Sequence, residues 1–166
     1  MCKPGANVVI FTDWKRLTLI VDGLTGAGFD VKDMIRMVKS NPMPRNRDRR
    51  FVVDYEVAVW ALKKGKWTFN RQSETYDTPC IHTTVTKKSE KKYTNHPTQK
   101  PVDAIEVLIK TLSCEGDTVL DCFMGSGTTA IACMNTQRNY IGFELDSDYY
   151  NKSIERINNH KTTGTK

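Results

Sequence analysis

Short apolar runs and helically spaced apolar residues alternate in the first part of the chain. Residues 7–12, "NVVIFT", are apolar and largely β-branched, which predicts a buried strand. Asp13 is a candidate N-cap for a helix after this strand, and Gly26 or Gly28 is a candidate stop. Between these signals, apolar residues recur at the spacing of one helix face: Leu17, Ile20, Val21 and Leu24.

Two further strands are predicted at residues 31–39 and 53–62, the second rich in Val, Tyr and Trp. The segment between them contains "SNPMPRNRDRR", in which two prolines exclude regular structure and four arginines face one aspartate. Residues 71–95 show no periodicity and contain the lysine-rich "KKSEKK". They are predicted to form an irregular connection in place of a larger insertion.

The second half of the chain repeats a strand and helix alternation. An amphipathic helix is predicted at residues 102–112, with Pro101 at its start. The following elements are a strand at 117–123, a helix at 127–137, a strand at 139–145 and a helix at 147–158. This order is typical of a doubly wound nucleotide-binding α/β fold, whose ligands sit at the carboxyl ends of the strands.

Composition narrows the classes of function. A length of 166 residues with 39% hydrophobic residues fits one α/β domain, taken here as 1–166. No run is long enough to cross a membrane, so a cytoplasmic protein with no membrane partner is expected. Five cysteines without CxxC spacing predict neither a disulfide framework nor a metal site, and are interpreted as reduced packing residues. The net charge of +6 suits a polyanionic partner.

The glycine-rich stretch "DCFMGSGTTA", residues 121–130, is the main candidate for a ligand site. No lysine follows the glycines, which argues against a Walker loop, and only the first two glycines of GxGxxG are present, which weakens an NAD site. Glu144 lies 17 residues after Gly127 at the end of the next predicted strand, where a carboxylate can accept from ribose hydroxyls. This order fits S-adenosylmethionine. A tight glycine turn without any ligand remains the alternative.

A second motif accompanies this loop. "HPTQKP", residues 96–101, precedes "VLDCFMGSGTT" and "GFELD", and together with "NPMPRNRDRRFVVDYEVAVWALKKGKWTFNR" these segments resemble the β-group DNA amino-methyltransferases over residues 4–157. The resemblance implies a Rossmann-like, mostly parallel sheet with one antiparallel strand. Cys122 stands where that family usually has proline. The resemblance implies cofactor-binding roles for Asp121, Phe123, Gly125, Gly127, Thr128, Glu144, Thr98, Gln99 and Lys100.

The basic segments are candidate contacts for double-stranded DNA, because Arg and Lys that neutralise phosphates supply most sequence-independent affinity. The alternative is an ordinary solvated charged surface. For "HPTQKP", the corresponding alternative is a proline-bounded helix entry with solvent-facing His96 and Lys100. The tryptophans are interpreted as packing residues rather than base-stacking groups. The candidate DNA-binding residues are Arg45, Arg47, Arg49, Arg50, Lys87, Lys88, Lys91 and Lys92.

One segment that the resemblance requires is not found. The family holds the target amine with an Asp/Ser/Asn-Pro-Pro-Tyr/Phe tetrapeptide, whereas this sequence contains no Pro-Pro pair, and "NPMP" follows a different strand. The resemblance places the tetrapeptide on a central strand between the strand ending at Asp121 and the strand 7–12. The chain is therefore expected to lack that strand and every catalytic residue on it, with the missing part lost, carried by a second chain, or removed by the assigned start.

Two classes of function follow. The first is part of an S-adenosylmethionine-dependent enzyme that methylates the exocyclic amine of adenine or cytosine in DNA after flipping the base. The second is a non-catalytic module, or an inactive remnant, that binds cofactor and DNA. The sequence does not decide between adenine and cytosine.

Overall fold

The structure is a computed structural model, and it describes residues 2–44, 47–94 and 96–163. Backbone contacts divide the chain into two compact units. Unit 1 comprises Met1–Val85 and Thr111–Ser113, and unit 2 comprises Thr86–Lys110 and Cys114–Lys166. The assignment of 1–166 to a single domain stays a prediction.

Unit 1 contains a four-stranded sheet in the order β1-β3-β2-β4. β3 runs antiparallel to both β1 and β2, while β4 is parallel to β2. β3 is therefore the one antiparallel strand among β1 to β4, which confirms the predicted strand directions. The strands are β1 (Asn7–Thr12), β2 (Phe29–Lys39), β3 (Tyr55–Lys63) and β4 (Cys80–Thr83).

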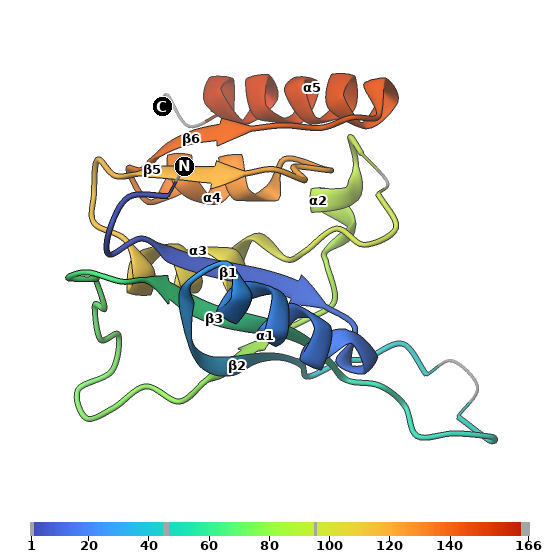
Figure 1. The fold of residues 1–166 in the computed structure, drawn as a ribbon. Helices are drawn as coiled ribbons and strands as arrows, with labels where there is room; N and C mark the ends of the chain where they lie inside the picture. The colour runs from blue at the N-terminus through green and yellow to red at the C-terminus, as the bar shows by residue number, and fades with distance from the viewer. Residues whose placement is uncertain (1, 45–46, 95, 164–166) are drawn as a thin grey trace. The chain divides into compact units, whose positions relative to one another are not determined.

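The helix α1 (Leu17–Gly26) covers one face of this sheet, as Figure 1 shows. Its buried Leu24 packs with Val59 and Ala61 of β3, so the predicted apolar stripe forms the core of unit 1. A 3-10 turn, Trp14–Arg16, leads into the helix. The Asp13 side chain accepts from the Lys15 N–H at 2.9 Å, which confirms the predicted cap at the start of this turn.

Unit 2 contains two parallel strands whose arrows point the same way in Figure 1. The order strand, glycine loop, helix, strand, helix agrees with the prediction. The strands are β5 (Thr118–Asp121) and β6 (Asn139–Gly142). The helices are α2 (Lys88–Lys91), α3 (Val102–Leu112, its last residues in unit 1), α4 (Thr128–Asn135) and α5 (Ser147–Thr163).

The core of unit 2 joins the glycine loop to its two flanking helices. Met124 of the loop packs with Ile131 of α4 and Ile157 of α5, and Tyr140 of β6 lies against this cluster. Since the loop residue Met124 is itself 6% exposed, burial of apolar surface anchors the middle of the loop.

Three predictions about local structure are wrong. Residues 71–95 include β4 and α2 rather than only irregular chain. β4 was missed because so short a strand shows no period of its own, and its partner strand β2 is distant in the sequence. The cysteines are mostly not packing residues, since only Cys133 is buried while Cys2, Cys114 and Cys122 are exposed.

The third concerns the tryptophans: Trp14 is 59% exposed and Trp67 is 46% exposed, so neither is a core residue. Trp60, by contrast, donates from its indole to the Asn7 side chain and lies 5.7 Å from the Phe69 ring, as expected of a packing residue.

β5 and β1 belong to separate sheets. Among the described strands, β1 pairs with β3 and β5 pairs with β6, and neither has a strand partner on its other edge. In the described part of the chain, no helix combines the length and apolar character needed to span a membrane.

Candidate functional site

The glycine loop joins β5 to α4 within unit 2 and adopts a conformation that side chains disfavour. Gly125 has φ +50° and Gly127 has φ +73°, both in the left-handed region. A Cβ at Gly127 would lie 3.3 Å from both Ile157 Cδ1 and Ser153 Cβ. Glycine is thus favoured at position 127 by the backbone conformation, and a side chain there would also press on α5.

Two carboxylates hold the loop, Asp121 at both of its ends and Glu144 at Gly125 in its middle. Asp121 accepts from the Phe123 N–H at 3.0 Å and from the Thr129 hydroxyl at 2.5 Å. Glu144, two residues beyond β6, accepts from the Gly125 N–H at 2.7 Å and from the Asp146 N–H at 3.0 Å. The loop is therefore closed by hydrogen bonds from its own strand and from the tip of the next one.

These N–H groups also keep Glu144 ionised. Donation from the Asp146 backbone, opposed by partial burial and aided by the N–H groups of Gly125 and Leu145, lowers the pKa of Glu144. A carboxylate has about four acceptor positions on its two oxygens, so two backbone bonds leave capacity for a ligand hydroxyl.

The segment 96–101 lies against the same loop. A Cβ at Gly125 would be 3.3 Å from His96 Nε2, so the imidazole occupies the space beside the glycine. The ring packs edge-on against Tyr149, with 4.4 Å between centroids, and the Thr98 N–H donates to Nδ1 at 3.3 Å. Burial, and then Lys100, lower the pKa of His96, while Glu144 acts in the opposite sense. His96 is thus a packed residue of the site rather than a solvent-facing one.

The structure gives three different surroundings to the predicted residues of this segment. Gln99 is 7% exposed, accepts from the Thr94 hydroxyl at 2.6 Å and donates to the Glu90 carbonyl at 2.9 Å. The Lys100 carbonyl accepts from the Thr128 hydroxyl at 3.2 Å, which connects the segment to the start of α4. Thr98 is exposed. Gln99 therefore stabilises the segment from within, and Thr98 is open to a ligand.

A buried cation of this site was not found from the sequence. Arg156 of α5 is 5% exposed and donates to the carbonyl of Ser126 at 2.9 Å. Its position in the predicted helix could have indicated burial. Arg156 shares one face of α5 with Ser153 and Ile157, at i, i+3 and i+4 spacing. The periodicity of that helix placed a charged residue on the apolar face, and this anomaly could have been noticed.

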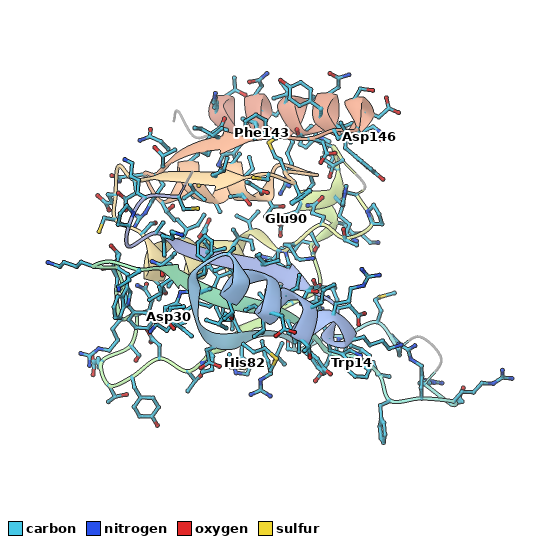
Figure 2. All side chains as sticks on the ribbon, viewed as in Figure 1. Trp14, Asp30, His82, Glu90, Phe143 and Asp146 are labelled. Carbon is cyan, nitrogen blue, oxygen red and sulfur yellow. The ribbon has the colours of Figure 1, made fainter. Side chains whose placement is uncertain are left out.

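Apolar side chains stand exposed around the loop and the tip of β6. Phe123 is 91% exposed, Phe143 is 60% exposed and Leu145 is fully exposed; Phe143 and Asp146 are labelled in Figure 2. Two further apolar residues, Leu120 and Ile141, are paired in register across β5 and β6 and are about half exposed. These residues leave one face of the strand pair and the rim of the loop open to a ligand or partner.

The predicted DNA-binding residues fall in two places. Arg47, Arg49 and Arg50 lie exposed in the connection from β2 to β3 in unit 1, while Arg45 lies outside the described residues. Arg47 lies 3.8 Å from Asp48, with both side chains largely solvated. The lysines are all exposed at and beside α2 in unit 2: Lys87, Lys88, Lys91 and Lys92.

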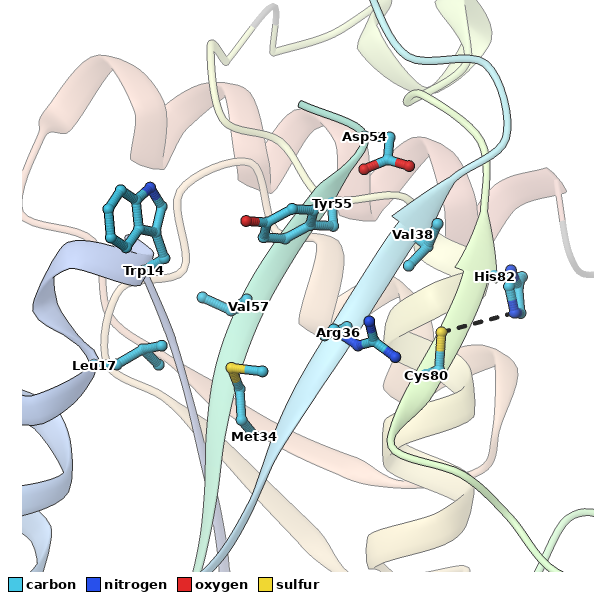
Figure 3. Close-up of a pocket in the computed structure, with 10 residues that line it drawn as sticks. All are labelled: Trp14, Leu17, Met34, Arg36, Val38, Asp54, Tyr55, Val57, Cys80 and His82. Carbon is cyan, nitrogen blue, oxygen red and sulfur yellow. Dashed lines mark hydrogen bonds between the residues drawn. The ribbon is translucent and has the colours of Figure 1, made fainter. Parts of the chain in front are cut away.

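Unit 1 contains a separate pocket of about 600 Å³, shown in Figure 3. It lies beside the N-terminal end of α1, with Trp14 and Tyr55 contributing aromatic rings and Arg36 a guanidinium. Cys80 Sγ lies 3.7 Å from His82 Nε2 on its far wall. Tyr55 begins β3, directly after the connection that bears the arginines. Aromatic and basic groups therefore occur near the same end of the β3 strand. Within the described ranges, no group of three or more His, Cys, Asp or Glu residues could hold a metal ion.

Comparison with known proteins places these features in a wider group. The model of the DNA methylase family N6_N4_Mtase matches residues 1–155. Type II methyltransferase M2.LlaDCHI of Lactococcus lactis subsp. cremoris is 30% identical over 171 residues, covering 98% of this chain and 64% of its own length. Type II methyltransferase M2.DpnII of Streptococcus pneumoniae is 30% identical over 164 residues, covering 93% and 61%. The chain thus spans about three fifths of the length of these curated relatives.

Solved structures agree with this grouping. A crystal structure of the M1.HpyAVI–SAM complex superimposes with a TM-score of 0.85 at 44% identity, covering 94% of this chain and 76% of that one.

Proposed function

Because this chain belongs to the DNA methylase family, we propose that it binds S-adenosylmethionine in unit 2 and takes part in methylating adenine N6 or cytosine N4 in double-stranded DNA. The observation that carries the proposal is the closed glycine loop, in which Glu144 accepts from the Gly125 N–H and Thr128 donates to the Lys100 carbonyl. This geometry brings the two motifs of the sequence together in one unit. When bound, the cofactor supplies the methyl group.

The residues present fit such a cofactor. Both loop glycines are left-handed, and a Cβ at either would meet His96 or α5, so glycine lets the loop turn tightly between β5 and α4. The Ser126 N–H and the first N–H groups of α4 make no backbone hydrogen bond among the described residues, and such groups suit a carboxylate. Glu144 offers an ionised acceptor for ribose hydroxyls, and Phe123 offers an exposed ring for stacking.

Within this proposal the predicted residues have two kinds of role. Asp121 and Gln99 act by holding the loop and the segment 96–101, since their polar atoms bond to the protein itself. The residues that we propose to contact the cofactor are Phe123, Gly125, Gly127, Thr128, Glu144, Thr98 and Lys100.

We assign DNA contact to the exposed basic residues of the β2–β3 connection and of α2. Their exposure leaves the guanidinium and ammonium groups available to phosphates. The pocket beside Trp14 and Tyr55 adds stacking surface next to that connection, which supports contact with nucleic acid at this edge of unit 1. A cytoplasmic location belongs to the same proposal.

The amine-holding tetrapeptide is assigned to polypeptide not contained in these 166 residues. The sequence has no Pro-Pro pair, and β1 and β5 each have one strand neighbour among the described strands. A strand supplied from elsewhere, on the same or a second chain, would pair with the edge of a strand in one of the two sheets. The competing proposal, a non-catalytic module that binds cofactor and DNA, is favoured by the same absence.

Calorimetry with S-adenosylmethionine and with its demethylated product tests the cofactor site directly. Saturable binding is expected, and Glu144→Ala is expected to weaken it tenfold or more, which corresponds to at least about 1.4 kcal/mol. Glu115→Ala is the matched control, because Glu115 is exposed and precedes β5 at the opposite end of that strand. Absence of binding to the folded chain, or equal binding by both variants, would contradict the proposal.

A further inference from the structure

Arg156 is a buried charge whose partners are two residues of the candidate cofactor site and Glu90 of α2. Its guanidinium is 5% exposed, and burying an unpaired charge is strongly unfavourable. Nη1 lies 2.9 Å from the Ser126 carbonyl, 3.3 Å from the Ser126 hydroxyl and 3.1 Å from the Thr128 hydroxyl. Nη2 lies 3.7 Å from Glu90 Oε2. The charge is therefore compensated by the loop on one side and by α2 on the other.

The bond to the Ser126 carbonyl acts on the backbone of the loop. A peptide group is planar, so the orientation of the Ser126 carbonyl also fixes the N–H of Gly127. That N–H donates to the Met124 carbonyl at 2.9 Å and closes the turn. Ser126 stands between two left-handed glycines, which are free to adopt other conformations. A directional cation at this carbonyl selects one of these conformations.

Glu90 extends the network to the other motif. Its Oε2 accepts from the Val102 N–H at 3.1 Å, at the start of α3, and its backbone carbonyl accepts from Gln99 Nε2 at 2.9 Å. Glu90 lies on α2, where it is labelled in Figure 2, while the lysines of that helix face solvent. One ion pair thus connects α5, the glycine loop and the segment 96–101.

A contribution to folding stability does not by itself explain why the Arg156–Glu90 ion pair is buried. Buried ion pairs are often replaceable by apolar residues of similar size without loss of stability, whereas a fully satisfied polar network specifies one arrangement. In the part of the chain that the structure describes, no fully buried side-chain N or O atom lacks a hydrogen-bond partner, and the buried atoms of this network are no exception.

From this arrangement we infer that Arg156 is a positioning residue, which holds the glycine loop in its cofactor-binding conformation through Ser126 and Thr128 and is itself oriented by Glu90. The inference rests on the proposed function for the identity of the ligand, S-adenosylmethionine. The way in which Arg156 acts is inferred from its contacts with the loop. Arg156 need not contact the cofactor. Its planar fork is matched to several acceptors at once, a geometry that lysine does not reproduce.

The test compares Arg156→Met, Arg156→Lys and Glu90→Gln with Lys152→Met in the full 166-residue chain. Lys152 lies on the same helix but is exposed. Well below each variant's unfolding midpoint, calorimetry with S-adenosylmethionine is expected to show binding weakened about tenfold or more for both Arg156 variants. Glu90→Gln is expected to weaken binding less, and Lys152→Met to leave it within twofold. The backbone amide signals of Gly125 and Gly127 are expected to shift in the Arg156 variants.

A purely structural role would lower the melting temperature while leaving the cofactor affinity and both glycine amide signals unchanged in the folded variants, and that result would overturn the inference. If Arg156→Met does not fold, Arg156→Lys provides the same readouts, and wild-type affinity and amide signals in that variant would overturn the inference. If the wild-type chain itself binds no cofactor, the proposed function fails. The glycine amide signals then decide on the positioning role alone.

Discussion

The Glu144 carboxylate accepts a hydrogen bond from the Gly125 N–H at 2.7 Å, across 19 residues of sequence. The contact joins the loop after one strand to the segment after its parallel neighbour, at the carboxyl edge of β5 and β6. We expect the shape of the glycine loop to depend on the ionisation of this side chain.

The first prediction concerns that ionisation. The pKa of Glu144 is lowered from its ordinary value of 4.5, chiefly by the Asp146 N–H. Because the folded-state pKa is the lower one, the stabilisation is complete above pH 4.5 and is lost as the pH falls through the lowered value. The amide signal of Gly125 is expected to change in this acidic window.

Glu144→Gln should remove that titration, and the Gly116 amide is the control, because it donates to the Gln137 carbonyl instead of a carboxylate. A Gly125 signal that changes only above pH 4.5, or that titrates equally in the variant, would show that Glu144 does not control the loop.

The second prediction separates backbone strain from crowding. Gly127→Ala and Gly116→Ala both place a side chain at positive φ, +73° and +81°, which costs about 1–2 kcal/mol each. Only at Gly127 would the new Cβ also lie 3.3 Å from α5, since nothing lies within 4 Å of Gly116. Urea unfolding should therefore show the larger decrease in stability for Gly127→Ala, and equal decreases would mean that α5 yields without cost.

The third prediction concerns DNA. Replacing Arg47, Arg49 and Arg50 by glutamine, together with Arg45 from outside the described residues, should weaken binding to any duplex. It should also reduce the slope of log affinity against log salt by up to about 0.9 for each phosphate that is no longer neutralised. A set of exposed lysines elsewhere in unit 1 is the charge control: Lys3, Lys64 and Lys66. Equal effects per charge removed by the two sets would indicate that net charge, and not a particular DNA-binding surface, sets the affinity.

The fourth prediction uses cysteine reactivity. Cys122 is exposed within the glycine loop, whereas burial raises the pKa of Cys133 to about 11. At neutral pH an alkylating reagent should modify Cys122 and spare Cys133. S-adenosylmethionine should slow modification of Cys122 but not of exposed Cys2, measured by peptide mass spectrometry. Unequal protection is the expected sign of a ligand at the loop, and identical rates with and without cofactor would count against it.

The fifth prediction concerns catalysis. The purified 166-residue chain should not transfer methyl groups to DNA. No segment of its sequence contains a Pro-Pro pair flanked by an acceptor for the amine and an aromatic ring. Asp13 follows β1 beside Trp14 and is the carboxylate that could stand in for the missing amine acceptor. Its side chain already accepts from the Lys15 N–H. Adding a polypeptide that contains an Asp-Pro-Pro-Tyr strand should restore transfer and raise the melting temperature together. Transfer of labelled methyl groups by the chain alone, abolished by Asp13→Asn, would place the catalytic acid inside this sequence.

The sequence by itself determined most of the elements and the backbone character of the glycine loop. Residues 102–112 and α1 carry a helical apolar period, and "GSG" between a strand and a helix restricts the backbone to conformations that glycine favours. These features depend on neighbouring residues, so they can be predicted from local pattern. The position of Glu144 at the tip of the next strand followed from the same alternation of strand and helix.

Only the tertiary structure decided which polar groups meet. The short strand β4 exists because β2 offers it a parallel edge, and the inward orientation of Gln99 depends on Thr94 and Glu90. Arg156 lies on the buried face of its helix, yet the residues next to it in the sequence do not indicate that Ser126, 30 residues earlier, is its partner. Periodicity gives the direction in which a side chain points, whereas the partner of a buried polar group is set by how distant segments pack.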